Sequence, residues 1–259
     1  MTNENNYSAI ISNARILLPQ ISQLTETVPY EAKGVLYSEI LFLAACLYNK
    51  KVNRILESGR ARGQSTLLLA KTFPQAEIIS YEFDKNSEDV KVAEERLSGY
   101  SNVTMKFGDS LKELPKIAQS DDVVIIDGPK MFIALRLALK LLIKNKVQHI
   151  FIHDLPKEDS TRRFLDSFFK EALFADYKGI ANITSVLDQK IIDLIPPHNR
   201  LNGFEGDYGY GYSLSYLPYN PKRRYLMLYY LSFPYDLLTS ETNIVYRCLR
   251  KVRHLIKSI

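Results

Sequence analysis

From residue 53 onward, short apolar runs alternate with longer segments of helical character, and this alternation restricts the fold more than any other feature of the chain. The apolar runs predict strands over the following ranges: Arg54–Glu57, Ile78–Glu82, Val103–Phe107, Val123–Ile126 and Ile150–Ile152. The segments between them predict helices over 65–73, 86–98, 110–118, 130–144 and 159–174. Because strands that alternate with helices form parallel sheets covered on both faces, we expect an α/β fold with a doubly wound, mostly parallel sheet.

The segments on either side of this alternation predict additions to the sheet. Residues 8–25 and 31–49 predict two helices, and the second has apolar residues at helical spacing. Ile191–Ile195 and Tyr210–Leu217 predict a hairpin that gives a seven-stranded sheet an antiparallel edge. We therefore expect an N-terminal helical cap over 1–50, an α/β domain over 51–218 and a C-terminal extension over 219–259.

Composition excludes several classes of protein. Hydrophobic residues make up 46% of the chain and charged residues 24%, which is typical of a globular protein and not of a disordered one. No apolar run approaches the roughly 20 residues that a membrane span requires, and the polar first residues predict no signal peptide. Cys46 and Cys248 are the only cysteines, so we expect no disulfide framework and a reducing, cytoplasmic location.

The basic surplus of the chain lies at its C-terminal end. The net charge is +5, and five basic residues follow Glu241, the last acidic residue, so residues 1–241 are balanced. Residues 242–259 also place apolar side chains at helical spacing, which predicts a basic amphipathic helix. Two interpretations stay open: the apolar stripe packs on the body of the protein, or the helix makes peripheral contact with an anionic membrane surface.

A glycine turn follows the first strand of the α/β region. It reads Glu-Ser-Gly-Arg-Ala-Arg-Gly-Gln-Ser over residues 57–65 and leads into a predicted helix. In open α/β sheets ligands bind where strands end, and glycines allow the backbone to approach the ligand closely. The spacing fits neither the P-loop nor the dinucleotide-binding glycine pattern. Arg60 and Arg62 predict either a contact with an anionic group or solvated side chains.

The turn fits the pattern acid-x-Gly-x-Gly-x-Gly, with Ala61 at the middle glycine, and further acidic residues follow the later strands in order. This ordered set resembles the class I S-adenosylmethionine-dependent methyltransferases over about residues 31–217. The resemblance implies a Rossmann-like fold in which residues 51–218 bind S-adenosylmethionine, with Glu82 accepting hydrogen bonds from the ribose hydroxyls. It implies these cofactor-binding residues: Glu57, Ser58, Gly59, Arg60, Ala61, Gly63, Ser65, Glu82, Phe83, Asp109, Ser110 and Asp127.

The segment after the fourth strand, Asp127–Lys130, reads Asp-Gly-Pro-Lys. It is similar to the metal-dependent small-molecule O-methyltransferases, in which an Asp-x-x-Lys sequence at this place supplies a metal ligand and a general base. The resemblance implies metal binding by Asp127 and Asp154, which could hold Mg²⁺ together with water molecules. Leu155 stands where that group has an Asn ligand, so the sequence leaves open whether a metal is bound.

His153 is a second candidate base, because an imidazole titrates near neutral pH. The other interpretation of His153 is a structural hydrogen bond to a nearby loop. Adjacent residues on a strand point to opposite faces, so a direct pair between His153 and Asp154 is not expected. The catalytic candidates are Lys130, His153 and Asp127, and the sequence does not decide which of Lys130 and His153 is the base.

We therefore expect O-methylation of a small-molecule or sugar-like acceptor. One alternative is a binding or regulatory protein that keeps this fold and transfers nothing. A nucleic-acid methyltransferase is disfavoured, because Asp127–Lys130 differs from the Asn/Asp-Pro-Pro-aromatic sequence typical of that class. Nine of the 17 tyrosines fall within residues 208–235, which indicates either packing surface or an aromatic-lined acceptor pocket or interface. A homo-oligomer is a further expectation.

Overall fold

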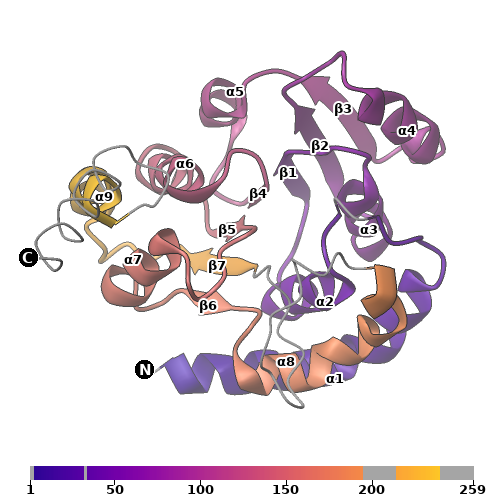
Figure 1. The fold of residues 1–259 in the computed structure, drawn as a ribbon, viewed down its shortest axis with the longest axis horizontal. Coiled ribbons are helices and arrows are strands. Elements are labelled where there is room, and N and C mark those ends of the chain that lie inside the picture. Colours follow the sequence, from indigo (N-terminus) through magenta and orange to yellow (C-terminus); the bar gives the residue numbers. More distant parts are fainter. Residues whose placement is uncertain (1–2, 32–33, 195–213, 240–259) are drawn as a thin grey trace, which may run out of the picture.

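Seven strands form one sheet in the order β3-β2-β1-β4-β5-β7-β6 (Figure 1). The computed structural model describes residues 3–31, 34–194 and 214–239. The strands are β1 (Arg54–Ser58), β2 (Glu77–Glu82), β3 (Val103–Phe107), β4 (Val123–Ile126), β5 (His149–Ile152), β6 (Leu173–Phe174) and β7 (Ser215–Pro218). The five strands β1 to β5 are parallel, and β7 runs antiparallel to its neighbours β5 and β6. The predicted doubly wound, seven-stranded, mostly parallel sheet is confirmed.

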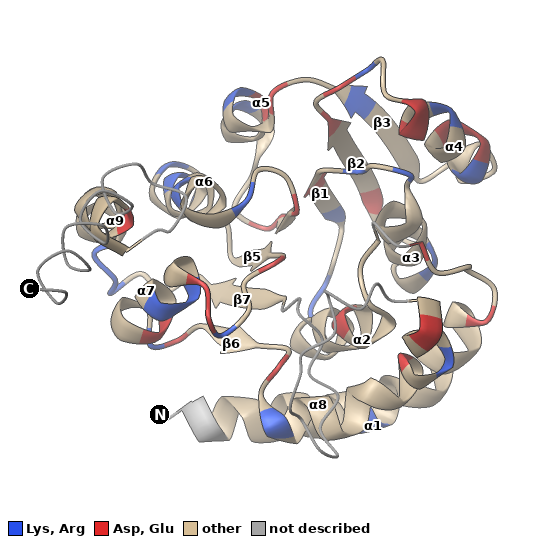
Figure 2. Cartoon of the chain, viewed as in Figure 1, with Lys and Arg blue, Asp and Glu red and all other residues tan. Residues whose placement is uncertain are grey.

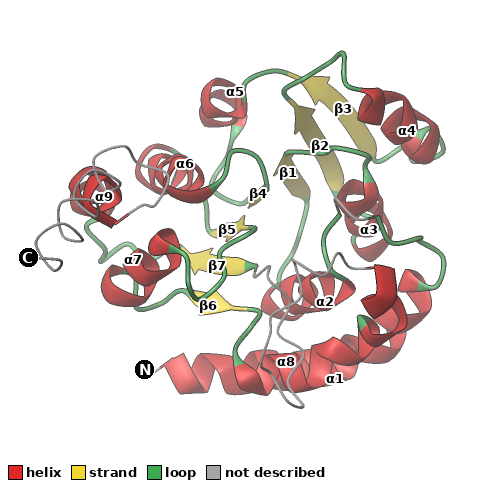
Figure 3. Ribbon diagram, viewed as in Figure 1, coloured by secondary structure: helices red, strands yellow, loops and turns green. Residues whose placement is uncertain are grey.

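Helices cover both faces of the sheet (Figure 3). In the described ranges they are α1 (Asn3–Thr25), α2 (Tyr37–Cys46), α3 (Gln64–Thr72), α4 (Glu88–Leu97), α5 (Ser110–Ile117), α6 (Met131–Lys144), α7 (Ser160–Phe168), α8 (Lys178–Thr184), α9 (Tyr225–Thr239) and the 3₁₀ turns η1 (Ser185–Leu187) and η2 (Gln189–Leu194). None of them is both long enough and apolar enough to cross a membrane.

Each face of the sheet has its own hydrophobic core. Helices α1 to α4 and α8 pack with Ile55 and Val123 on one face. Helices α5, α6, α7 and α9 pack with Leu56 and Val124 on the other. Neighbouring strand residues therefore bury on opposite faces, which explains why the central strands are continuously apolar.

The strand order reverses beside β1, which lies between β2 and β4. Ser58 at the end of β1 is aligned with Ile126 at the end of β4. The loops that follow these strands therefore meet at one edge of the sheet, which is the place where open α/β sheets bind their ligands.

Two expectations for the far edge of the sheet are wrong. The helix expected over 159–174 ends at Phe168, and Leu173–Phe174 forms β6 instead. Leu173 and Phe174 are buried beside β7, so tertiary packing overrides their local helical preference. Within Ile191–Ile195, the described residues belong to η2, so the expected hairpin does not form there. The described part of the second expected strand contains β7, which begins at Ser215, and residues 210–213 lie outside the described ranges.

The division into three parts and the helix over 242–259 stay predictions, since residues 240–259 lie outside the described ranges. Some tyrosines of the late cluster support the packing interpretation. The ring of Tyr225 stacks on Phe169 with centroids 5.9 Å apart, and Tyr235 makes an edge contact with Phe164 at 5.2 Å.

Helix α2 is buried along its whole length, so its first turn needs partners inside the protein. The carboxylate of Glu39 accepts a hydrogen bond from the backbone nitrogen of Leu36 at 3.0 Å. Asp188, which is fully buried, accepts one from the backbone nitrogen of Ser38 at 3.1 Å. Two carboxylates therefore stabilise the positive end of the α2 dipole.

Burial raises the pKa of Asp188 to about 7, despite the hydrogen bonds from Ser38. Because the folded pKa exceeds the unfolded one, the group stabilises the fold at low pH, and this contribution is lost as the pH rises towards 7. We expect Asp188→Asn to become more stable relative to the wild type by roughly 2 kcal/mol between about pH 5 and pH 8. Urea unfolding of both proteins at the two pH values measures the difference, and a difference that shrinks with pH would contradict it.

Candidate functional site

The turn after β1 lies directly against the loop after β4. Gly59 has a φ of +89°, and a Cβ added there would lie 2.6 Å from the backbone nitrogen of Gly128. The carbonyl oxygen of Ser58 accepts hydrogen bonds from the backbone nitrogens of Asp127 and Gly128, at 2.8 and 3.0 Å. Position 59 requires glycine, because a side chain would adopt a strained φ and collide with the second loop.

Glu57 lies beneath this turn and is 1% exposed. Its carboxylate accepts hydrogen bonds from the hydroxyls of Ser65 at 2.6 Å and of Thr66 and Ser80 at 2.5 Å. Burial raises the pKa of Glu57, although the three hydroxyls oppose the shift. Through these three hydrogen bonds, Glu57 of β1 is joined to α3 by Ser65 and Thr66 and to β2 by Ser80. Gly63, with a φ of +75°, begins α3 and faces α4.

The two arginines of the turn make internal contacts. Arg60 is 2% exposed, donates to the carbonyl oxygen of Ser80 at 2.7 Å and lies 5.2 Å from the ring centre of Phe107. Burial lowers the pKa of Arg60. Arg62 forms an ion pair with Glu31 at 3.0 Å. The same edge of the sheet holds a cavity that Gly59 helps to line. Neither arginine lines this cavity.

That cavity has a volume of about 280 Å³. It is lined by Ser58, Gly59, Tyr81, Glu82, Phe83, Gly108, Ser110, Leu111, Gly128 and Pro129. Glu82 accepts hydrogen bonds from the backbone nitrogens of Ala61 and Phe83, both at 2.8 Å, which fixes its carboxylate at the end of β2. Phe83 exposes 76% of its surface beside it. Asp109 does not line the cavity; its carboxylate accepts from the backbone nitrogen of Leu111 at 3.0 Å and caps α5.

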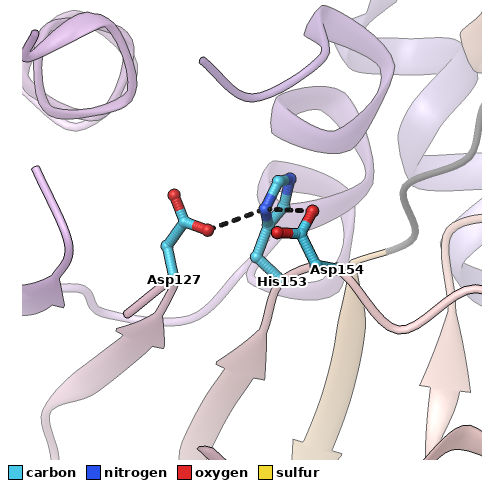
Figure 4. Close-up of side chains that lie close together, drawn as sticks. All are labelled: Asp127, His153 and Asp154. Atoms are coloured by element: carbon cyan, nitrogen blue, oxygen red, sulfur yellow. Dashed lines mark hydrogen bonds and ion pairs between the residues drawn. The ribbon is translucent and has the colours of Figure 1, made fainter. Parts of the chain in front are cut away.

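A cluster of charged side chains lies beside the cavity, where β4 and β5 end (Figure 4). The Nδ1 atom of His153 is 2.8 Å from Oδ1 of Asp127 and 3.0 Å from Oδ1 of Asp154. The ammonium group of Lys130 forms ion pairs with both carboxylates. The structure therefore brings together the four residues that the sequence proposed for catalysis and metal binding.

The direct pair between His153 and Asp154 contradicts the expectation from strand alternation. Strand β5 ends at Ile152, and Asp154 has a φ of +59°. The backbone has already left the extended conformation, so neighbouring side chains no longer point to opposite faces.

Glu39 of α2 is a fifth member of the cluster and was not among the residues predicted from the sequence. Its Oε2 atom is 2.9 Å from Nε2 of His153, and both side chains are almost completely buried. Glu39 is the only charged residue within Tyr37–Cys46, an otherwise apolar helix. A single carboxylate in an apolar helix is the signal that could have identified it, because buried charges require partners.

The members of this cluster shift one another's pKa values. Burial lowers the pKa of His153, but Glu39, Asp127 and Asp154 outweigh burial and raise it well above the ordinary value. Burial likewise lowers the pKa of Lys130, and the two aspartates raise it overall. Burial raises the pKa values of Asp127 and Asp154, whereas His153 and Lys130 lower both overall. In this arrangement three carboxylates face two cations, and Lys130 holds its proton.

Asp127, His153 and Asp154 also offer the ligand set of a metal centre. One ligand atom from each lies within 4.8 Å of the others. When His153 is neutral and donates from Nε2 to Glu39, the lone pair of its Nδ1 atom faces both carboxylates. A histidine ligand whose second nitrogen donates to a carboxylate is the usual arrangement in metal sites. The donor set therefore fits a divalent cation, provided that Lys130 moves away from the carboxylates.

Comparison with solved structures identifies the fold. A SAM-dependent O-methyltransferase from Thermotoga maritima has a TM-score of 0.51 at 15% identity, over 78% of this chain and 72% of that one. A putative O-methyltransferase from Klebsiella pneumoniae has a TM-score of 0.42 at 19% identity, over 78% and 90%. The N-terminal domain of EvdMO1 with SAH bound has a TM-score of 0.33 at 24% identity, and the match spans 42% of this chain and 47% of that domain's chain. No family model and no curated protein matches the sequence. The chain has the class I methyltransferase fold.

The contact between Gly59 and Gly128 gives a direct test of this geometry. We expect Gly59→Ala to lower the free energy of unfolding by about 1–3 kcal/mol, because it combines a positive φ with a steric collision. Gly99→Ala is the matched control, since a Cβ there meets nothing within 4 Å; we expect it to change stability by less than about 1 kcal/mol. Chemical unfolding measures both variants. Equal effects would show that the loops do not approach as described.

Proposed function

We propose that this chain is an S-adenosylmethionine-dependent O-methyltransferase that acts on a small-molecule or sugar-like acceptor. One observation carries the proposal: Gly128 and Pro129 line the cavity, while the residues on either side of them, Asp127 and Lys130, belong to the charged cluster. A cofactor cavity and a group of proton-transfer residues therefore share one short loop. The class I methyltransferase fold supports this interpretation.

The cavity suits the adenosine part of the cofactor. Oε2 of the Glu82 carboxylate accepts one backbone hydrogen bond, from Ala61, and Oε1 accepts a short one from Phe83 and a long one of 3.5 Å from Asp84, so the carboxylate keeps acceptor capacity. Glu82 can therefore also accept hydrogen bonds from the two ribose hydroxyls. The exposed ring of Phe83 offers an apolar surface for a base. Ser110 also lines the cavity, and its hydroxyl donates to the carbonyl oxygen of Gly128 at 3.2 Å.

The charged cluster suits the removal of a proton from an acceptor hydroxyl. The sulfonium of the cofactor supplies an electrophilic methyl group, so the protein has to orient the hydroxyl and hold its proton. Lys130 and His153 are the groups beside the cavity that exchange protons. Both have raised pKa values, because the carboxylates favour their charged forms. Either residue acts as a base only after this stabilisation is reduced.

We further propose that Asp127, His153 and Asp154 hold a divalent cation such as Mg²⁺. The cation would supply positive charge that neutralises the carboxylates and polarises an acceptor hydroxyl. Lys130 would then no longer be held by two carboxylates, and its pKa would fall towards the range of a general base.

Two substitutions separate cofactor binding from turnover. We expect Glu82→Ala to weaken binding of S-adenosylhomocysteine by about 10- to 100-fold, because charge-assisted hydrogen bonds to the ribose are lost. We expect Lys130→Ala to keep the affinity within about twofold and to lower methyl transfer by at least about 100-fold. Titration calorimetry and transfer of a labelled methyl group to hydroxyl-bearing acceptors measure the two effects.

Lys112→Ala is the control for Lys130. Lys112 follows Leu111, which lines the cavity, but it belongs to α5 and exposes 75% of its side chain. Unchanged affinity in Glu82→Ala would contradict the binding mode. Tight binding without transfer to any acceptor would favour the alternative of a regulatory protein that keeps the fold.

Metal binding has its own test, which does not need turnover. We expect Mg²⁺ or Mn²⁺ to raise the melting temperature of the wild type, because a ligand that binds only the folded state stabilises it. Asp154→Asn removes one anionic ligand and should abolish the rise, whereas Asp166→Asn, an exposed aspartate of α7, should retain it. A melting temperature that does not respond to either ion in the wild type would show that Lys130 alone occupies the space between the carboxylates.

A further inference from the structure

Helix α9 carries a largely exposed apolar face; among the described residues, the guanidinium of Arg136 lies over one of its rings, that of Phe233, at 4.5 Å. The exposed residues of this face, called here the α9 face, are Leu226, Met227, Tyr230, Phe233, Leu237 and Leu238, with exposures between 41% and 64%. Their spacing puts them on one side of the helix. The opposite side buries Tyr225, Leu228 and Ser232 against the second core. A continuous exposed apolar surface of this kind usually marks an interaction site.

Basic residues surround the α9 face. The stretches 131–148 and 219–239, which hold α6 and α9, contain seven Lys and Arg and one acidic residue, Asp236. Asp236 pairs with Arg136 at 2.6 Å, and Arg223 pairs with Glu171. The other five, called here the basic rim, have no carboxylate within ion-pair distance among the described residues: Lys140, Lys144, Lys146, Lys222 and Arg224. Figure 2 shows α6 and α9 in blue and tan, with one red position on α9. Since residues 1–241 are balanced as a whole, this surplus is local.

A groove joins the apolar face to the basic rim. It has a volume of about 450 Å³ and lies between the end of α6 and the start of α9. Leu142, Ile143, Leu226 and Met227 give it apolar walls, and Arg224 adds a positive charge to its lining beside Arg223, which is paired with Glu171. A site with apolar walls and a guanidinium in its lining fits an amphiphile that carries an anionic head group.

We propose that the α9 face and the basic rim dock on an anionic phospholipid membrane surface. The apolar side chains of α9 would enter the interface, and the basic rim would meet the lipid phosphates. This contact requires neither the cofactor nor methyl transfer, so it goes beyond the proposed function and does not depend on it.

Charge complementarity favours a lipid surface over two other possible partners of the α9 face, a second copy of the chain and the segment 242–259. A second copy of the chain packed on the same face by two-fold symmetry would bring one basic rim against another. The segment 242–259 carries five basic residues and no acidic side chain, so covering the α9 face with it would also place like charges together. An anionic lipid surface satisfies the apolar face and the basic rim at the same time.

Vesicle flotation of the full chain tests the proposal. We expect the protein to float with vesicles of phosphatidylcholine and phosphatidylglycerol, with at least about tenfold weaker binding to phosphatidylcholine alone and loss of binding at high salt. The double variants Leu226→Asp/Tyr230→Asp and Lys222→Glu/Arg224→Glu should each lower binding by at least about tenfold.

The matched controls are Ile16→Asp, an equally exposed apolar residue on α1, and Lys91→Glu, an exposed lysine on α4. Both should bind as the wild type does. Circular dichroism and melting temperature confirm that every variant is folded.

Three results would overturn the proposal. The first is no flotation of the wild type with anionic vesicles at low salt. The second is wild-type binding in both α9 variants together with loss of binding when the bases of 242–259 are reversed, which would assign the membrane contact to that segment alone. The third is a dimer in sedimentation analysis that Leu226→Asp/Tyr230→Asp converts to a monomer without any effect on lipid binding.

Discussion

The direct backbone contact between the ends of β1 and β4 determines how this edge of the sheet is built. One carbonyl, that of Ser58, accepts hydrogen bonds from two consecutive residues of the second loop, and Gly59 leaves no room for a side chain between them. Both sides of the contact, Gly59 and Gly128, line the cavity, and the residues that flank Gly128 and Pro129 belong to the charged cluster. Because the loop Asp127–Lys130 contributes residues to both, a small shift at position 59 would change the distance between the cavity and the charged cluster.

The charged cluster shows how this chain departs from the O-methyltransferases that it resembles. Leu155 replaces their Asn ligand, and its side chain is fully buried in the second hydrophobic core, where it cannot face a ligand. His153, two residues earlier, faces Asp127 and Asp154 instead, and Glu39 fixes the far side of its ring. Burying this many charges is tolerated because each carboxylate has a cationic or hydrogen-bonding partner. In the metal site proposed above, His153 would therefore take the third ligand position in place of that Asn.

Much of this arrangement could be predicted from the sequence. The buried central strands gave continuous apolar runs, so their bounds agree with the structure to within about two residues. The edge could not be predicted, because Leu173 and Phe174 become a strand only when β7 is beside them. Within the site, the residues that follow strands were found from their order, whereas Glu39 was missed because it comes from a helix outside the sheet pattern. The pair between His153 and Asp154 depended on one positive φ at Asp154, and no local pattern signalled that angle.

Helix α2 has a consequence for the way in which the chain is made. Glu39 of α2 contacts His153, which lies 114 residues later in the chain. Ser38 of α2 contacts Asp188, which lies 150 residues later. A ribosome therefore releases α2 long before it has synthesised the two groups that α2 requires. Until then, docking α2 would bury Glu39 without its cation, at a large energetic penalty. Helix α2 should therefore dock on the sheet only after His153 and Asp188 have been synthesised.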